Sequence, residues 1–351
     1  MIRVLFFAVV LISVLVLVGY QSPPSNHNAM EEGTKVVPGY PISFPLDHGP
    51  HNDYGLEWWY LTANLTDENG EHHGLQYTLF RFRGPQGEQG PWWQGQWYMA
   101  HLMWEHQGKH QAWERFGRGA GQAGVESQPF AAWLDDWRLA SVGESYQPLS
   151  LQAGNEIVAF DLLLTDSPLI LHGDNGYSDK SGDGSLASYY YTLPRLQLSG
   201  ALTVAGQRLA VTGTAWLDRE WSSALLDQRF SGWDWLALNL DDGNNLMLFC
   251  LRGSGSNPSN CEATWMSADG DSQHLDADQF QLRPLQTVQI DDGSYPVSWQ
   301  VMVPSKQLDL TVISRSQDQL NRLTTTYWEG PATVSGSHNG YGFIEMTGRG
   351  Q

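Results

Sequence analysis

Residues 56–65, LEWWYLTANL, and residues 231–240, SGWDWLALNL, carry one pattern twice. Trp58 aligns with Trp233, and Asn64 aligns with Asn239. Each passage makes a short polar turn and leads into a second apolar run, LFRFRG at 79–84 and LFCLRG at 248–253. A repeated strand–turn–strand pattern predicts two related β units, so we expect function in a Trp-rich pocket of a β scaffold built twice.

The composition favours antiparallel sheets over helical bundles. The chain has 351 residues with 16 Trp, 37 Gly and 17 Pro, and hairpin signals stand at 68–70, 205–206, 241–243 and 268–270. We predict an all-β protein of two barrels or sandwiches, with domains over residues 41–194 and 195–351. Strands are expected at 188–193 and 195–204 on either side of this boundary. The one helical turn is expected at 128–136.

The charge balance excludes several function classes. The formal net charge is −19, and the whole chain has only 19 Lys and Arg residues. Nucleic-acid binding and docking on anionic lipid both need clustered basic residues, so neither is expected. We find no P-loop, dinucleotide-binding or nucleophile-elbow motif, and the histidines have no recognised metal-ligand spacing. The sequence therefore indicates neither a cofactor nor a metal.

The N-terminus is a targeting segment. Arg3 precedes an uninterrupted apolar run over residues 4–18, which is typical of a signal-peptide core and short for a membrane span. We predict a signal peptide or N-terminal anchor at 1–20 and a polar tether at 21–40. The protein is then exported to the periplasm or cell envelope, either released or tethered to the inner membrane.

The two cysteines flank a turn-rich stretch. Cys250 and Cys261 stand near the facing ends of two predicted strands, 246–251 and 261–266. In an exported protein this arrangement favours a disulfide that closes the hairpin, with free thiols as the alternative.

Strand parity places two acids beside apolar rows. Glu57 shares a face with Trp59 and Leu61, and Asp234 shares a face with Leu236. Desolvation there would raise the pKa of each carboxyl and keep a neutral acid available at pH 7. The alternative is a carboxylate that nearby arginines or backbone N–H groups satisfy.

Two further positions are candidates for proton transfer. Asp218 would share a face with Trp216 and Glu220 and point away from Arg219, so it is a candidate acid or else a member of an ion-pair network. His101 lies in a hydrophobic strand and is either a general base or a core histidine with both nitrogens bonded. The candidate ligand-binding rings are Trp58, Trp59, Tyr60, Trp216, Trp221, Trp233, Trp235 and Trp328.

Several multi-residue motifs, in this order, resemble one family. They are FPLDHG at 44–49, EWWY at 57–60, DREWSS at 218–223, GWDW at 232–235 and YWEGP at 327–331. They are similar to the AttH-like, or lipocalin-like, "predicted secreted hydrolases", which are related to carotenoid 1,2-hydratase. The resemblance covers the chain from about residue 38 and implies two lipocalin-like barrels in the envelope, often with an ABC-type export system. No nucleophile or metal motif supports hydrolysis.

Three functions are compatible with these residues. The first is a carrier that binds an apolar or isoprenoid-like molecule in the Trp-rich pocket, acting with an ABC-type exporter. The second is a hydro-lyase that adds water to an unsaturated lipid, with Asp218 or Asp234 as the acid. Such an enzyme needs a carboxylic acid and aromatic faces that stabilise a cation. The third, glycan binding, requires solvent-facing Trp residues.

Overall fold

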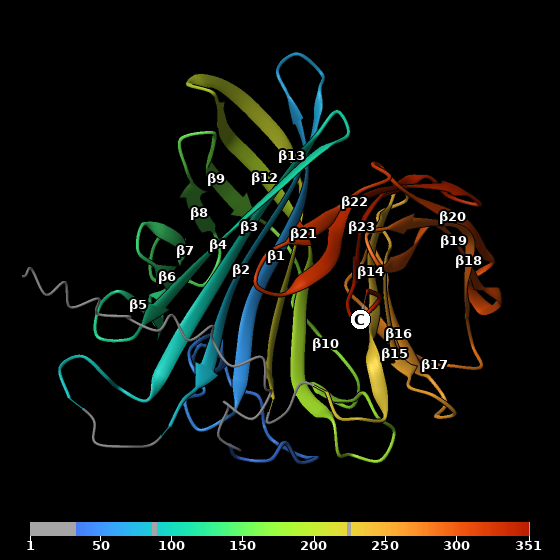
Figure 1. Ribbon diagram of the computed structural model, residues 1–351, viewed down its shortest axis with the longest axis horizontal. Helices are drawn as coiled ribbons and strands as arrows, with labels where there is room; N and C mark the ends of the chain where they lie inside the picture. Colours follow the sequence, from blue (N-terminus) through green and yellow to red (C-terminus); the bar gives the residue numbers. More distant parts are fainter. Residues whose placement is uncertain (1–32, 86–89, 223–225, 351) are drawn as a thin grey trace, which may run out of the picture.

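The computed structural model describes residues 33–85, 90–222 and 226–350, and these form an all-β protein with two curled antiparallel sheets (Figure 1). The predicted fold class is confirmed. Hairpins form at all four turn signals that the sequence contains. No helix in the described ranges is long and apolar enough to cross a membrane.

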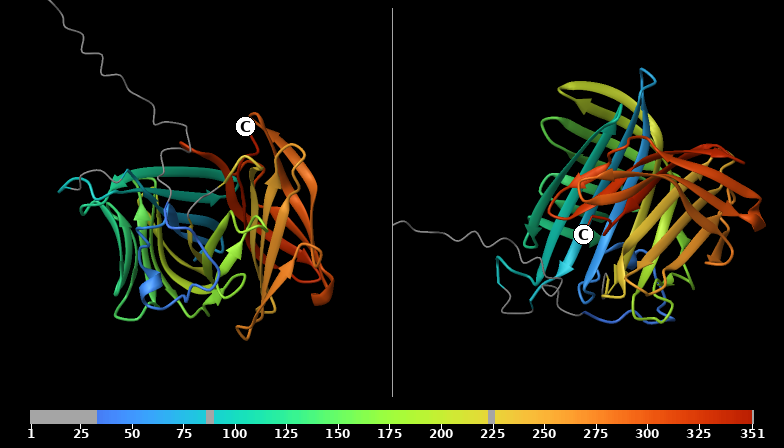
Figure 2. Two further views of the ribbon diagram at one scale, coloured as in Figure 1. Left: turned by 90° about the horizontal axis from the view of Figure 1, so that it is seen from below. Right: turned by 45° about the vertical axis from the view of Figure 1, so that its right-hand side comes forward.

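The first sheet has the strand order β4-β3-β2-β1-β13-β12-β9-β8-β7-β6-β5, with β10 and β11 also paired to β12. Its strands are β1 (Leu56–Asp67), β2 (His72–Arg83), β3 (Gln96–His106), β4 (Lys109–Arg118), β5 (Ala123–Ser127), β6 (Phe130–Leu134), β7 (Trp137–Ser141), β8 (Leu149–Gly154), β9 (Val158–Thr165), β10 (Ile170–Leu171), β11 (Tyr177–Asp179), β12 (Ala187–Val204) and β13 (Gln207–Ser222). The sheet curls into a nearly closed barrel (Figure 2). Its inside is filled by alternate residues such as Trp59, Leu61 and Leu217.

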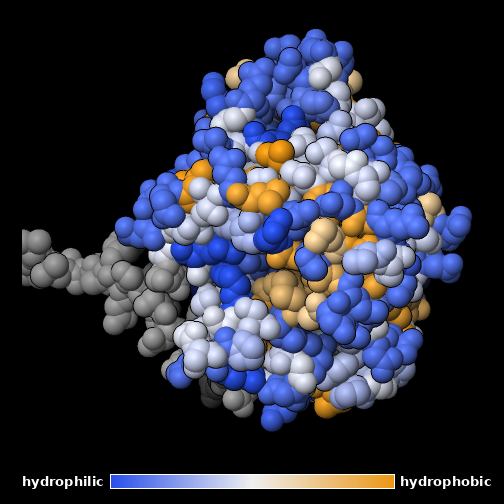
Figure 3. Space-filling model, turned by 90° about the vertical axis from the view of Figure 1, so that its right-hand side faces the viewer, coloured by the Kyte–Doolittle hydropathy of each residue, from blue (hydrophilic) through white to orange (hydrophobic). Residues whose placement is uncertain are grey.

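The second sheet is a half-barrel with the order β17-β16-β15-β14-β23-β22-β20-β19-β18, and β21 pairs with β22. Its strands are β14 (Phe230–Leu240), β15 (Asn245–Gly253), β16 (Asn260–Met266), β17 (Ser272–Asp276), β18 (Gln281–Ile290), β19 (Gly293–Val303), β20 (Leu308–Ser314), β21 (Leu320–Arg322), β22 (Thr326–Gly336) and β23 (Gly340–Met346). Short 3-10 helices cover Leu46–His48 and Pro304–Lys306. Polar residues cover most of the side shown in Figure 3, and apolar residues gather near its middle.

The chain passes to the second sheet only after Ser222, so the predicted boundary at residue 195 falls inside β12. The ladder between β12 and β13 shifts register between Leu193 and Leu196, around Pro194. Proline has no N–H to donate to a ladder, and the sequence pattern therefore suggested two strands where the structure has one irregular strand.

The expected helical turn at 128–136 is wrong, because this segment forms β6 and the turns beside it. Phe130, Ala132 and Leu134 alternate into the barrel core, which is the spacing of a strand.

The predicted signal peptide or anchor, and the tether as far as residue 32, lie outside the described residues. Residues 33–40 pack against the first sheet. Val36 is buried, and the backbone N–H of Val37 donates to the Tyr189 hydroxyl at 3.0 Å.

Candidate functional site

The outer face of the first sheet carries a row of polar side chains on neighbouring strands. Asp218 on β13 lies opposite Tyr60 on β1, Tyr60 lies opposite Thr78 on β2, and Thr78 lies opposite His101 on β3. Side chains directly opposite in antiparallel strands are neighbours on one face. The parity of the sequence had placed Tyr60 on the face away from the barrel core, and the structure confirms it.

A second row crosses the facing surface of the half-barrel. Phe249 on β15 lies opposite Trp235 on β14, Trp235 lies opposite Glu345 on β23, and Glu345 lies opposite Glu329 on β22. The second row therefore presents two aromatic rings followed by two carboxyl groups to the first sheet.

The two rows are in contact. The Tyr60 hydroxyl donates to the carboxyl group of Glu329 at 3.0 Å, and the rings of Tyr60 and Trp235 meet edge to face with their centres 5.2 Å apart. The indole N–H of Trp235 also donates to the Tyr190 hydroxyl at 3.3 Å. A buried apolar cluster surrounds these contacts and includes Met103, Leu186, Trp216, Ala237, Met247, Phe249 and Phe343.

Asp218 is held inside this interface. Its side chain accepts hydrogen bonds of 2.6 Å from both the Tyr190 hydroxyl and the Trp216 indole N–H, and the residue is 3% exposed. Burial raises the pKa of Asp218 to about 7, although its hydrogen bonds act in the opposite direction. Near neutral pH this carboxyl therefore exists in both protonated and ionised forms.

The carboxyls of the second row are also desolvated. Burial, with a smaller contribution from the nearby charge of Asp218, raises the pKa of Glu345 to about 7, although the hydrogen bond from Trp233 acts in the opposite direction. Its Oε1 accepts a 2.6 Å hydrogen bond from the indole N–H of Trp233. The pKa of Glu329 lies well above its usual range because of burial and the charge of Glu345.

Lys180 borders the site. Lys180 pairs with Glu220 at 2.5 Å, and its Nζ lies 4.3 Å from the ring centre of Phe249. This ion pair lies beside the aromatic interface, and the Lys180 ammonium group balances the charge of Glu220, which is two residues after Asp218 on β13.

His101 belongs to the row but does not match either sequence interpretation. Its Nδ1 is bonded to the Tyr327 hydroxyl at 2.8 Å, while its Nε2 has no hydrogen-bond partner in the described ranges. Burial lowers the pKa of His101 to about 3. The expectation of a base whose pKa sits near the working pH is therefore wrong, and a neutral imidazole orients Tyr327.

Glu57 lies outside the site, at the end of the barrel interior. Arg81 and Arg219 both donate to its carboxylate, and the backbone N–H of His51 donates at 2.9 Å. Burial alone would raise the pKa of Glu57, but the charges of Arg219 and Arg81 outweigh it and the pKa is lowered. The expected neutral acid is wrong here, and the arginine-bonded alternative describes this residue.

Asp234 also fits the arginine-bonded alternative. It lies on the inner face of the half-barrel and accepts hydrogen bonds from Arg252 at 2.5 Å and from Arg349 at 2.6 Å. Of the four candidate catalytic residues, Asp218 and His101 lie on the same outer face but three strands apart, whereas Glu57 and Asp234 belong to the inner faces.

The aromatic candidates divide in the same way. Trp58, Tyr60, Trp216, Trp233 and Trp235 gather at the interface, whereas Trp59 and Trp328 fill the two sheet interiors and Trp221 packs under the N-terminal segment. All eight are buried or half-buried. Glycan binding required solvent-facing Trp side chains, and none of these eight candidate residues is solvent-facing.

Sequence reasoning missed Tyr190, Glu329 and Glu345 as site residues. An available signal was the position of each acid in an apolar strand, since Glu345 stands between Ile344 and Met346. Their relation to Asp218 depends on how the two sheets pack, which strand parity does not describe.

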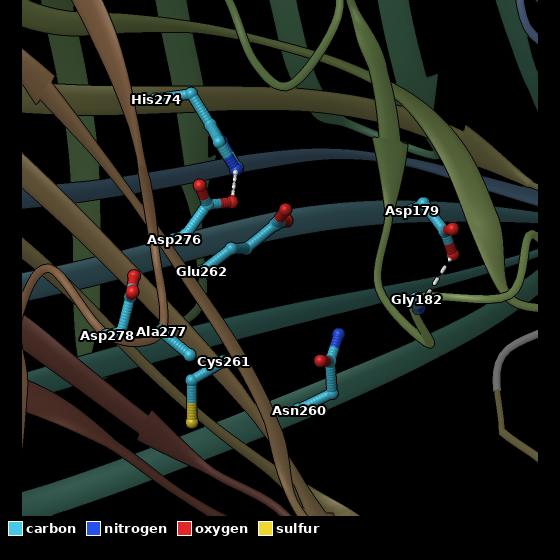
Figure 4. Close-up of a pocket in the computed structure, with 9 residues that line it drawn as sticks. All are labelled: Asp179, Gly182, Asn260, Cys261, Glu262, His274, Asp276, Ala277 and Asp278. Atoms are coloured by element: carbon cyan, nitrogen blue, oxygen red, sulfur yellow. Dashed lines mark hydrogen bonds and ion pairs between the residues drawn. The ribbon is translucent and has the colours of Figure 1, made fainter.

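A surface pocket lies next to the interface, between the loop that follows β11 and strands β16 and β17 (Figure 4). Its lining includes Asp179, Glu262, Asp276 and Asp278, and His274 pairs with Asp276 at 3.4 Å. No group of three or more His, Cys, Asp or Glu residues in the described ranges is arranged to hold a metal ion. This charged lining does not suit an apolar ligand, so we place the candidate site between the two rows.

Cys250 and Cys261 form a disulfide between β15 and β16, on the opposite face of the sheet from Phe249 of the second row.

Comparison with known proteins establishes the family, because residues 35–349 match the AttH-like family. The chain belongs to the AttH-like family. The crystal structure of a putative AttH from Nitrosomonas europaea is 34% identical, with a TM-score of 0.82 over 91% of this chain and 100% of that chain.

More distant relatives share the AttH-like fold. Kievitone hydratase from Nectria haematococca is 19% identical with a TM-score of 0.67, over 91% of this chain and 97% of that chain. CghA in complex with Sch210972 is 11% identical with a TM-score of 0.56, over 91% and 95%.

A curated relative is the dehydratase asqC of Emericella nidulans. It is 23% identical over 202 residues, which make up 51% of this chain and 52% of the relative. The match thus spans about half the length of that protein.

Proposed function

We propose that this AttH-like protein is a hydro-lyase, which adds water to an unsaturated apolar substrate, or removes it, between the two rows. The observation that carries the proposal is the buried carboxyl of Asp218, whose pKa of about 7 leaves it able to donate a proton at neutral pH. Asp218 is 3% exposed and lies among the rings of Trp216, Tyr190 and Trp235.

The chemistry requires the residues that surround Asp218. Protonation of an isolated alkene produces a carbocation, and a water oxygen then attacks that carbon. Each desolvated aromatic face stabilises a nearby cation by up to about 2 kcal/mol. Tyr60, Trp216 and Trp235 supply such faces within one cluster, with the Trp216 and Trp235 ring centres 6.2 Å apart.

The comparisons support this class of reaction. One solved relative is a hydratase and the curated relative is a dehydratase, and these names describe water addition and water removal, the two directions of one class of reaction. A carrier for an apolar molecule would use the same rings, but it would not need a protonated carboxyl among them.

The margin of the interface indicates the direction of access. Trp58, Trp233 and Glu345 are half-buried, whereas Asp218 and Glu329 are 3% and 0% exposed. A substrate that enters past the half-buried side chains reaches Asp218 after Trp58 and Trp233 move aside.

The test uses two isoprenoid probes, lycopene and geranylgeraniol, in detergent micelles with the full-length protein. We expect the wild type to form water adducts detected by mass, and D218N to lose at least about 100-fold in rate. D309N changes an exposed acid on β20 and serves as the matched control. Equal rates for D218N and the wild type would show that Asp218 is not the acid. Stoichiometric binding of a probe without conversion would favour the carrier.

A further inference from the structure

The two sheets place a carboxyl at equivalent positions of the repeat. Aligning Trp58 with Trp233 makes Tyr60 on β1 equivalent to Trp235 on β14. Asp218 lies opposite Tyr60 on the neighbouring strand β13, and Glu345 lies opposite Trp235 on the neighbouring strand β23. The repeat thus builds two acids around one interface, one from each sheet.

The two acids also have matching surroundings. Each accepts a 2.6 Å hydrogen bond from an indole N–H, which comes from Trp216 for Asp218 and from Trp233 for Glu345. Burial raises the pKa of both carboxyls to about 7. Two coupled groups of this kind release their protons as a pair, so near pH 7 one of them can be protonated while the other is ionised.

Trp235 connects the pair. Its side chain is the cross-strand neighbour of Glu345, and its indole N–H donates to the Tyr190 hydroxyl, which in turn donates to Asp218. Trp235 therefore neighbours Glu345 directly and is linked to Asp218 through Tyr190, and its ring is one that would stabilise the proposed carbocation.

We propose that Glu345 is the second catalytic carboxyl of this site and that it takes the proton of the attacking water. The assignment rests on the proposed hydro-lyase function. The protonated carboxyl of Asp218 gives its proton to one alkene carbon and becomes a carboxylate. The water oxygen bonds to the other carbon, and the proton that this water loses passes to the carboxylate of Glu345. In dehydration the same groups exchange their proton states.

Glu345 fits this role better than the other titratable groups nearby. It is half-buried, and only its Oε1 has a hydrogen-bond partner among the described residues, so Oε2 is free to meet a water. Glu329 is 0% exposed, and both of its oxygens accept from Tyr60. Glu220 is paired with Lys180, and His101 is bonded to Tyr327.

The experiment follows geranylgeraniol with the full-length protein in D2O and records water addition and deuterium uptake into recovered alkene separately. We expect E345Q to lose about 100-fold or more in water addition while deuterium uptake continues, because Asp218 still protonates the alkene. D218N should lose both. D309N, which changes an exposed acid on β20, should keep both water addition and deuterium uptake at the wild-type level.

Chemical rescue separates lost chemistry from lost structure. Formate should restore water addition to E345A, since a small carboxylate can occupy the half-buried position and accept the proton of the water. It should not rescue D218A, because formate is ionised near neutral pH and has no proton to give to the alkene. Two results would overturn the role of Glu345 and leave the hydro-lyase function intact. The first is a wild-type rate in E345Q. The second is loss of both water addition and deuterium uptake in E345Q, together with no rescue of E345A by formate. A wild type that neither hydrates nor deuterates the probe would overturn the proposed function, and the role of Glu345 with it.

Discussion

The two sheets use the same repeat position for different purposes. The runs LFRFRG and LFCLRG place Arg81 in the first sheet where the second sheet has Cys250, and both side chains lie at the end of an inner face. Arg81 enters a buried ionic network with Glu57, whereas Cys250 is bonded to Cys261 on the neighbouring strand. The nearly closed barrel of the first sheet thus contains a buried ion-pair network, and the half-barrel of the second sheet has a disulfide between two adjacent strands at the equivalent position.

The outer faces differ less than the inner ones. Each sheet presents an aromatic ring and a neighbouring carboxyl to the interface, through Tyr60 with Asp218 and through Trp235 with Glu345. The two sheets therefore differ in the groups at the ends of their inner faces and match in the kinds of side chain, an aromatic ring and a carboxyl, that they present where they meet.

The largest effect on the free energy of unfolding is expected when the ion-pair network inside the first sheet is broken. E57Q leaves Arg81 and Arg219, both fully buried, without their counter-charge and should reduce the free energy of unfolding by about 3–5 kcal/mol. D234N is the matched change in the second sheet and should cost only about 2 kcal/mol, because Arg252 and Arg349 reach water at 18% and 16% exposure. Urea unfolding measures both, and equal losses would contradict the difference between the two interiors.

The next effect is on the pH dependence of stability, which should differ between Asp218 on the outer face and Glu57 on the inner face of the first sheet. The raised pKa of Asp218 means that the unfolded chain loses this proton at lower pH than the folded protein, so Asp218 lowers stability as pH rises from about 4 to 7. The contribution is at most about 4 kcal/mol and stays constant above that range. D218N should therefore gain stability relative to the wild type between pH 5 and pH 8, as measured by urea unfolding at both values.

Glu57 provides the opposite sign. Its pKa is lowered in the folded protein, so the stability that it contributes is present above about pH 4 and is lost at lower pH. Between pH 5 and pH 8 the deficit of E57Q should consequently stay constant. A pH-dependent gain in E57Q of the size expected for D218N would show that the two acids do not differ.

A smaller effect tests the covalent link of the second sheet. Replacing both cysteines, C250S with C261S, opens an 11-residue separation and should cost about 2–3 kcal/mol. Urea unfolding with and without a reductant gives the value, and reduction should have no effect on the double variant. An unchanged midpoint for the reduced wild type would mean that the half-barrel does not depend on the link.

The smallest effect concerns the equivalent asparagines, which each reach from one sheet to the other. Asn239 donates to the carbonyl of Pro194 at 2.7 Å, and Asn64 donates to the carbonyl of Gly342 at 3.3 Å. Asn64 also has a buried Oδ1 without a partner among the described residues. N239A should cost about 1 kcal/mol more than N64A in thermal or urea unfolding, and the reverse order would contradict this assignment.

Much of the local structure followed from the sequence. Strand parity correctly placed Trp59 inside the barrel and Tyr60 outside it, and it put Asp218 beside Trp216 with Arg219 pointing away. The prediction failed at Pro194, where a missing N–H produced an irregular strand that resembled two.

Local pattern alone determined which face each side chain occupies, because successive residues of a strand point to opposite sides of the sheet. It did not determine the charge state of the acids. Glu57 and Asp218 are both buried, yet Arg81 and Arg219 lower the pKa of Glu57, whereas no arginine or lysine among the described residues forms an ion pair with Asp218. Those partners arrive from other strands, and Glu345 comes from the other sheet. Only the tertiary structure decided this, since desolvation and nearby charge depend on what packs against a residue rather than on its neighbours in sequence.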